Sequence, residues 1–298
     1  MYASGMGRRE LFPLDRGLVV RMVVAGVLTP LIVVAALLAV VLLAPWKIVL
    51  GVAIALCIGV FAAVKERRDR APARALGAHE APELHAALER LCVVADLPKP
   101  SLVLEPEAQP NSWVVSAGRR HAQLHLTQGL LDCLGPSELE AVVAHELAHV
   151  AQRDAAVMTV VGGPGAALLT GGRELFGFGF WPVTLGGLLA MLIGWLGSLG
   201  ARLLSRGREF AADAGAVTLT GNPVALASAL SKVSAGLLAI PAADLRLAAS
   251  RDAFHLLPAG KGKSRIPLPA SHPPLRARIA RLERIEARLQ ASRPPRQR

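Results

Sequence analysis

The feature that most constrains the fold is a pair of uncharged apolar stretches near the N-terminus, residues 22–43 and 48–64. The first has about 22 residues, enough for a helix to cross the hydrocarbon core of a bilayer. Hydrophobic residues make up 53% of the chain and charged residues only 18%, which is typical of a membrane protein. A cleaved signal peptide is the alternative, but the first stretch is too long and lacks a clear cleavage site before the second. We therefore expect residues 1–74 to form an N-terminal transmembrane hairpin.

Basic residues lie on the outer side of both stretches, whereas their connection contains only Lys47. The flanking basic residues are Arg8, Arg9, Arg16, Arg21, Lys65, Arg67, Arg68, Arg70 and Arg74. Because short loops rich in Lys and Arg stay in the cytoplasm, the chain after residue 65 is predicted to start there. The same charge accounts for much of the net charge of +11. No basic surface with interleaved aromatic residues accompanies it, so we expect no nucleic-acid partner.

A second pair of uncharged stretches, residues 155–172 and 176–200, is separated only by Arg173, Glu174 and one leucine. The later stretch is long enough to span a bilayer, whereas the earlier one is interrupted by three glycines and a proline and is marginal. The pair forms either a second membrane hairpin or an apolar pair packed against the soluble part. We therefore expect a domain of residues 75–298 that is interrupted by a hydrophobic hairpin at residues 155–200.

The segment from His145 to His149 reads H-E-x-x-H within a stretch of helical periodicity. Ser137 and Glu140 precede it with the spacing of a helix capping box. Positions four apart on a helix lie about 6 Å apart along its axis, so the two imidazoles can hold one metal ion. Zinc is the usual occupant of such a site, and Glu146 is placed to reach a water at the metal. The alternative is two ordinary histidines on an amphipathic helix, since the motif also occurs by chance.

A second polar stretch, residues 205–213, contains Glu209 and Asp213 four positions apart. Helical spacing puts both carboxylates on one face. We expect Glu209 to be the third metal ligand, which leaves the fourth position for water. Asp213 is expected to accept the outer N–H of a ligating histidine and so fix its tautomer. The alternative is that both carboxylates only pair with nearby arginines; the upstream H-E-x-x-H motif favours the metal interpretation.

The rest of the chain predicts a mainly α fold with a small β-sheet, an α+β class. Helices are expected at residues 75–98, 222–240 and 275–289, strands at residues 101–104, 112–116 and 122–126, and an irregular loop at residues 241–270. Asn111, Ser112, Trp113 and Val114 are predicted to lie on a sheet edge that binds an extended peptide through backbone hydrogen bonds. An ordinary hairpin is equally compatible with this segment. The three cysteines lack paired spacing, which indicates a reducing compartment without disulfides.

Taken together, these motifs resemble those of the heat-shock membrane protease family HtpX, with the CAAX prenyl endopeptidases as more distant relatives. The matching segments are His145-Glu146-Leu147-Ala148-His149, Arg153-Asp154, Ser205-Arg206, Arg208-Glu209, Ala212-Asp213, Pro110-Asn111-Ser112-Trp113, Gly129-Leu130-Leu131, Ser271-His272-Pro273-Pro274 and Arg278-Ile279. The resemblance covers most of the chain from about residue 80 to about residue 285. Members of the family more often carry a small residue and another hydrophobe at Ser112-Trp113, and this departure touches the predicted substrate edge.

The resemblance implies a zinc-dependent endopeptidase with a zincin-like core and transmembrane helices. It implies one Zn²⁺ per chain, bound by His145, His149 and Glu209, with Glu146 as the catalytic base. It further implies a multi-pass protein of the inner (plasma) membrane that faces the cytoplasm, acts on unfolded or membrane proteins, and serves quality control in the stress response.

The favoured interpretation of Ser271-His272 is a loop that caps the following helix. The alternative is that His272, or an arginine such as Arg278, stabilises the oxyanion in peptide hydrolysis. The alternative function is a membrane-tethered regulatory metalloprotein that acts on one partner. A catalytically inactive scaffold is disfavoured because the three expected ligands and the base are all present. The sequence does not indicate an oligomeric state.

Overall fold

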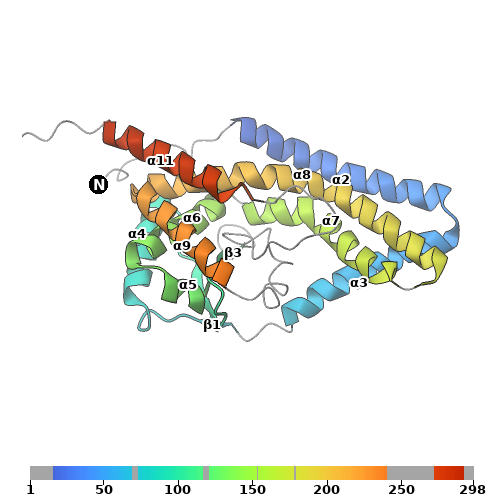
Figure 1. The fold of residues 1–298 in the computed structure, drawn as a ribbon, viewed down its shortest axis with the longest axis horizontal. Coiled ribbons are helices and arrows are strands. Elements are labelled where there is room, and N and C mark those ends of the chain that lie inside the picture. The colour runs from blue at the N-terminus through green and yellow to red at the C-terminus, as the bar shows by residue number, and fades with distance from the viewer. Residues whose placement is uncertain are drawn as a thin grey trace, which may run out of the picture.

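The computed structural model describes residues 16–68, 73–116, 121–152, 154–177, 179–239 and 272–291. The molecule is elongated, with a sheet-containing part at one end and long helices that extend away from it (Figure 1). The expected loop at residues 241–270 lies outside the described residues.

Four long helices make up the extended part: α2 (Arg16–Leu43), α3 (Trp46–Arg68), α7 (Asp154–Phe176) and α8 (Trp181–Thr220). Among the described residues, α2 and α8 contain windows long and apolar enough to cross a membrane, whereas the apolar part of α3 is shorter. Large apolar side chains on α2, such as Leu31 and Leu42, are mostly exposed. The expected N-terminal hairpin therefore appears as two helices of suitable composition, and its crossing of a membrane stays a prediction.

Glycines allow the backbones of α3, α7 and α8 to approach closely. Gly59 of α3 lies against the carbonyl of Ala167 on α7. Gly171 of α7 lies against the carbonyl of Ala55 on α3, where a side-chain methyl would overlap the oxygen atom. Close approach through small residues is the usual way in which helices associate in a bilayer, where apolar side chains gain little from leaving lipid.

The sheet has four strands in the order β1-β2-β4-β3. These are β1 (Arg74–Ala75), β2 (Ser101–Glu105), β3 (Ser112–Ser116) and β4 (Ala122–Thr127). β3 pairs with β4 antiparallel, β2 pairs with β4 parallel, and β1 pairs with β2 antiparallel. Among the described residues, β3 is thus an edge strand. The sequence predicted β2, β3 and β4 but neither β1 nor the parallel pairing.

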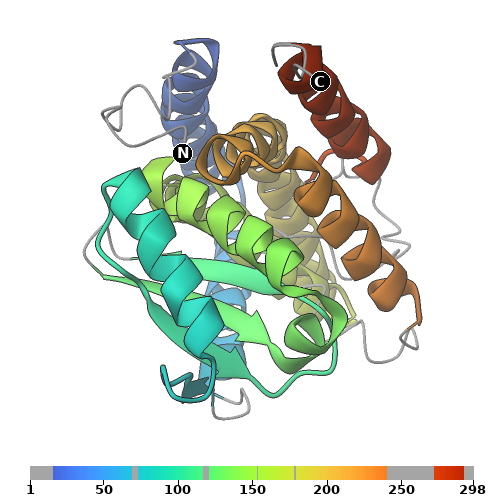
Figure 2. The same ribbon diagram turned by 90° about the vertical axis from the view of Figure 1, so that its left-hand side faces the viewer.

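Helices α4 (Pro82–Ala95) and α6 (Pro136–Gln152) lie side by side over one face of the sheet (Figure 2). Alternate strand residues, such as Leu124 and Leu126, point into the core that these helices share with the sheet. Almost every residue of α6 from Ala141 to Ala151 is buried, because β3, α4, α8 and α9 (Pro223–Ala239) all contact it. A helix enclosed on all sides can hold polar groups in fixed positions.

The N-terminus of α6 differs from the expected capping box. The helix begins at Pro136, and the backbone N–H of Gly135 donates to Glu138 Oε2 over 2.8 Å. Glu140 instead pairs with Arg90 of α4 over 3.1 Å. The prediction of a Ser137–Glu140 box was therefore wrong by two residues, because proline favours the first helical position and so puts the N-cap at Gly135.

The remaining helices are α5 (Gln128–Cys133) and α11 (Leu275–Ala291). α5 is capped by Thr127, whose hydroxyl accepts the N–H of Leu130. α11 packs against α9 and α8 and brings Arg278 into the interior. The fold is mostly helical with a small mixed sheet, which confirms the predicted class.

Candidate metal centre

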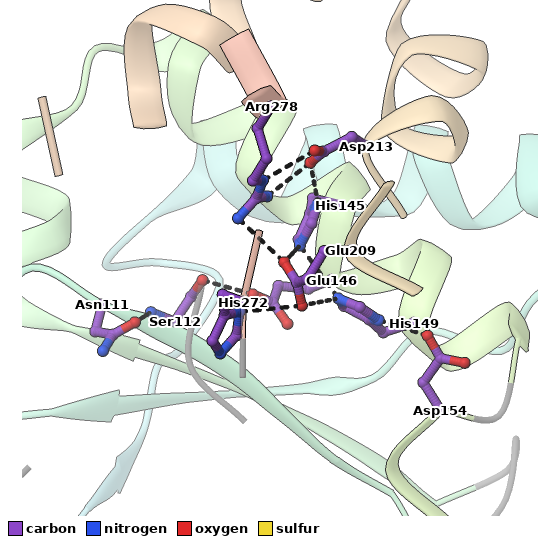
Figure 3. A network of polar contacts seen from close by, with 10 residues as sticks. All are labelled: Asn111, Ser112, His145, Glu146, His149, Asp154, Glu209, Asp213, His272 and Arg278. Carbon is purple, nitrogen blue, oxygen red and sulfur yellow. Dashed lines mark hydrogen bonds and ion pairs between the residues drawn. The ribbon is translucent and has the colours of Figure 1, made fainter. Parts of the chain in front are cut away.

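Two helices bring together the three side chains that the sequence predicts as metal ligands (Figure 3). His145 and His149 lie one turn apart on α6, and Glu209 comes from α8. The Nε2 atoms of the two histidines are 3.1 Å apart. Glu209 carboxylate oxygens lie 3.7 Å from Nε2 of His145 and 3.6 Å from Nε2 of His149. Ligand atoms about 2.0–2.2 Å from a tetrahedral ion are about 3.3–3.6 Å apart, so this spacing fits one ion.

The outer nitrogen of each histidine faces an aspartate. Nδ1 of His145 lies 3.1 Å from Asp213 Oδ1, and Nδ1 of His149 lies 2.6 Å from Asp154 Oδ2. A carboxylate at this position keeps the proton on Nδ1 and leaves a lone pair on Nε2. Two such lone pairs and a carboxylate that face one another form a donor set suited to a divalent cation.

Burial and, to a smaller extent, charge repulsion from His145 together lower the pKa of His149 to about 4, although the carboxylates of Glu209 and Glu146 oppose the shift. His149 is therefore neutral near pH 7, the protonation state in which imidazole binds metals.

Two buried arginines hold the aspartates. Arg278 of α11 donates from Nε and Nη2 to both oxygens of Asp213, over 2.9 and 2.6 Å, and its Nη1 lies 3.0 Å from Glu209. Burial opposes the charge of Arg278, but the carboxylates of Asp213 and Glu209 outweigh it and raise the pKa of the guanidinium. Arg208 of α8 contacts Asp154 over 2.7 Å. Each guanidinium is thus paired with an aspartate that faces one of the two histidines.

Glu146 faces the edge strand. The hydroxyl of Ser112 donates to Glu146 Oε1 over 2.7 Å, and both side chains are buried. The side chain of Asn111 accepts the backbone N–H of Ser112 over 2.9 Å. The first residues of β3 therefore lie directly beside Glu146.

The next residues of β3 point alternately into and away from the core. Val114 points into the core beneath α6. Trp113 lies on the opposite face of the sheet, where it stacks on His125 with a centroid distance of 5.1 Å and is only 4% exposed. The indole at the position where this chain departs from the family pattern therefore points away from Glu146.

His272 lies just before α11, with Nδ1 3.5 Å from Glu209 Oε1, and is buried. The structure thus brings both predicted oxyanion residues, His272 and Arg278, next to Glu209. Ser271, which precedes His272, lies outside the described residues.

The sequence interpretation assigned no role to Asp154 or Arg208, although both belong to segments that it had singled out. Their signal was present in the chain: a carboxylate follows His149 by five residues, and an arginine directly precedes Glu209. The contact between them joins positions more than 50 residues apart, and local periodicity carries no information about such a pair.

Most of this chain is similar in sequence to known proteins. Residues 78–286 match the model of peptidase family M48. The chain is 40% identical over 235 residues to "Protease HtpX homolog" of Moorella thermoacetica, covering 74% of this chain and 78% of that protein. It is 39% identical over 219 residues to "Protease HtpX homolog 2" of Methanosarcina mazei, covering 70% and 74%. A crystal structure of Ste24p from S. mikatae is similar with a TM-score of 0.47 and 18% identity, covering 86% of this chain and 66% of that one.

Proposed function

The chain belongs to peptidase family M48 and is an HtpX-like metalloprotease, and from this premise we propose that it is a zinc-dependent endopeptidase of the cytoplasmic membrane. Its proposed substrates are unfolded or membrane proteins, and its proposed role is their quality control. One Zn²⁺ per chain would be held by His145, His149 and Glu209.

The observation that carries this proposal is the convergence of α6 and α8 on one donor set. Two Nε2 atoms and a carboxylate lie within 4.8 Å of one another, and each histidine has an aspartate at its outer nitrogen. Imidazole and carboxylate are ligands that zinc prefers, and three protein ligands leave a position open for catalysis. When bound, zinc supplies Lewis acidity, which polarises a carbonyl and lowers the pKa of water from about 15.7 toward 7.

Glu146 is the proposed general base. It follows His145 directly on α6, so its carboxylate lies beside the donor set without belonging to it. Glu146 takes a proton from the attacking water and passes it to the nitrogen of the departing amine. Oε1 of this carboxylate accepts a hydrogen bond from the hydroxyl of Ser112. We therefore assign to Oε2 the uptake of the proton from water.

Edge strand β3 is the proposed binding site for the substrate backbone. An edge strand offers unpaired N–H and C=O groups that an extended peptide can pair with. Because β3 begins at Ser112, beside Glu146, a peptide that pairs with β3 brings its backbone past the base. This arrangement favours substrates that are unfolded locally, since only an extended segment can add to a sheet.

The oxyanion of the reaction is proposed to be stabilised by His272. Its imidazole lies beside Glu209 in a buried position, where a hydrogen bond to a developing negative charge is strong. Arg278 is the second candidate, but its Nε and Nη2 donate to Asp213. We therefore assign to Arg278 mainly the task of holding Asp213 and Glu209.

The proposed membrane arrangement has a transmembrane hairpin in residues 1–74 and a protease domain in residues 75–298, interrupted by a second membrane hairpin at residues 155–200. The exposed apolar side chains of α2 and the apolar first half of α8 support it. With both termini in the cytoplasm, Lys47 and the region of Arg173 would lie on the opposite side. Reporter fusions at Lys47 and near Arg173 test this topology, and cytoplasmic reporters at both sites would overturn it.

The decisive experiment for the function combines metal analysis with a cleavage assay in detergent. Wild type should bind one zinc per chain and cleave casein and unfolded membrane proteins broadly. Glu146→Gln should keep the zinc and lose cleavage, whereas Glu209→Ala should lose both. Full cleavage by Glu146→Gln would reject Glu146 as the base, and full zinc content in Glu209→Ala would reject the ligand set. Strict cleavage of a single target would instead favour the regulatory alternative.

A further inference from the structure

The ion pair between Asp154 and Arg208 takes no part in the chemical steps of the proposed mechanism. We propose that Asp154 and Arg208 are positioning residues for His149: they keep its proton on Nδ1 and so leave Nε2 free to bind the ion. This inference rests on the proposed function, because it concerns residues that position a ligand of the proposed metal ion. Neither residue contacts the reacting atoms.

The two oxygens of Asp154 face two different partners. Oδ2 accepts from Nδ1 of His149 over 2.6 Å, and Oδ1 lies 2.7 Å from Nη2 of Arg208 in an ion pair. The side chains of Asp154 and Arg208 are only 4% and 3% exposed. An unpaired buried carboxylate is costly, so the ion pair with Arg208 holds Asp154 in place with its other oxygen facing His149.

The contact also links the two helices that carry the predicted ligands. Arg208 directly precedes Glu209 on α8, whereas Asp154 is the first residue of α7, just after the helix that carries His149. One ion pair therefore fixes His149 relative to the helix of the third ligand. The other histidine has the same order of partners, with His145 facing Asp213 and Asp213 facing Arg278.

Substitution of Asp154 by asparagine gives a test that depends on which end of the amide group faces His149. Arg208 can only donate, so it should hold the amide oxygen of Asn and turn the amide NH₂ toward His149. The NH₂ group would then require an acceptor at Nδ1, which moves the imidazole proton to Nε2 and blocks metal binding. Without Arg208, the amide is free to rotate and to present its oxygen to His149 again.

The measurement is zinc affinity in the full-length Glu146→Gln protein, by competition with a chromophoric chelator, together with the visible absorption of the Co²⁺-loaded protein. Asp154→Asn should weaken zinc binding about 10–100-fold, the usual effect of losing an outer partner of a ligand. Arg208→Met should weaken it less. The double variant Asp154→Asn/Arg208→Met should bind zinc more tightly than Asp154→Asn alone, and Arg208→Lys should bind nearly as tightly as the parent.

The control is Arg284→Met, which removes the same charge from an exposed position on α11 and should leave zinc affinity unchanged. Thermal unfolding of each variant with EDTA monitors folding without metal, and Arg208→Lys supplies the conservative substitution if Asp154→Asn is unstable. Unchanged affinity in both single variants, or losses that merely add in the double variant, would overturn the proposal. Failure of the Glu146→Gln parent to bind zinc would overturn the proposed function itself, and this inference with it.

Discussion

The two ends of the molecule pack by different means. In the sheet-containing end, large side chains such as Leu124 and Leu147 are almost completely buried between the sheet and its helices. In the extended end, large side chains such as Leu31 point outward, whereas the helix backbones meet at glycines such as Gly171. Water drives the first kind of packing through burial of apolar surface. The second kind suits the proposed lipid surroundings, in which close packing, rather than removal of apolar surface from water, favours association of helices.

The largest effect is expected from Leu124→Ala at the sheet-containing end. Leu124 is fully buried, so the cavity should lower the free energy of unfolding by about 2–5 kcal/mol. The matched variant is Leu31→Ala on α2, where the side chain is 57% exposed and the change should stay within about 0.5 kcal/mol. Denaturant unfolding in detergent measures both. Equal losses in the two variants would mean that the two ends pack alike.

The next effect is expected from Gly171→Ala at the extended end. The added methyl would overlap the carbonyl of Ala55, so α3 and α7 must move apart at a cost of about 1–3 kcal/mol. Gly26→Ala on α2 is the control, because an added methyl there meets nothing within 4 Å. Alanine favours helix over glycine by about 1 kcal/mol, so the control should be neutral or stabilised. A Gly171→Ala protein as stable as the control would refute packing through glycine.

A smaller effect is expected from Glu138→Gln, which weakens a buried polar link between α6 and α9. Glu138 accepts from Ser228 over 2.6 Å and from Lys232 over 2.8 Å. Loss of its charge should cost about 1 kcal/mol at pH 7. Glu89→Gln is the control, since Glu89 is exposed and pairs only at the surface with Lys99, and its denaturant midpoint should not shift measurably. A midpoint for Glu138→Gln that equals wild type would refute the link.

The same carboxylate predicts a pH dependence. Burial raises the pKa of Glu138, but hydrogen bonds from Lys232, Ser228 and the backbone of Gly135 outweigh it and hold the pKa below its usual value. A lowered pKa in the folded state means that the stabilisation is complete above the unfolded-state pKa of about 4.3 and is lost as the pH falls through the folded-state value. Wild type and Glu138→Gln should therefore differ most at neutral pH and converge in stability as the pH falls below the lowered folded-state pKa.

The smallest effect on folding is expected from Ser112→Ala, at a contact that serves the site. The hydroxyl of Ser112 orients Glu146, so stability should change by less than about 1 kcal/mol while kcat falls about tenfold, equivalent to about 1.4 kcal/mol in the barrier. KM should hardly change, and Ser112→Thr should restore kcat. Ser231→Ala on the exposed face of α9 is the control. A loss confined to KM would assign Ser112 to substrate binding instead.

Local patterns predicted the elements of the fold better than the contacts between them. Pro82 and the leucines after it predicted α4, and two short segments, residues 112–116 and 122–126, predicted β3 and β4. The short strand β1 and the parallel pairing of β2 with β4 could not be predicted, because both depend on hydrogen bonds between distant segments. Likewise, the separate apolar and acidic stretches after Phe176 gave no sign that one uninterrupted helix, α8, contains both.

The same division holds for the site. The spacing of His145 and His149 follows from helix geometry and was readable from the chain. The meeting of Glu209 with these histidines was inferred from residue types and the family resemblance, and the structure now places the three side chains together. Asp154 and Arg208 form an ion pair between segments that are far apart in the sequence. Such a pair leaves no periodic signal in the sequence.

Helix α8 runs without a break for 40 residues, from its apolar beginning at Trp181 to Thr220, and it carries Glu209 in its second half. At 1.5 Å per residue, about 42 Å separates those two residues. A tilt of about 3° around the apolar end would therefore swing the carboxylate by about 2 Å, roughly the length of a metal–oxygen bond. In the proposed bilayer setting, a change in the tilt of the apolar part of α8 would therefore move Glu209 relative to the two histidines.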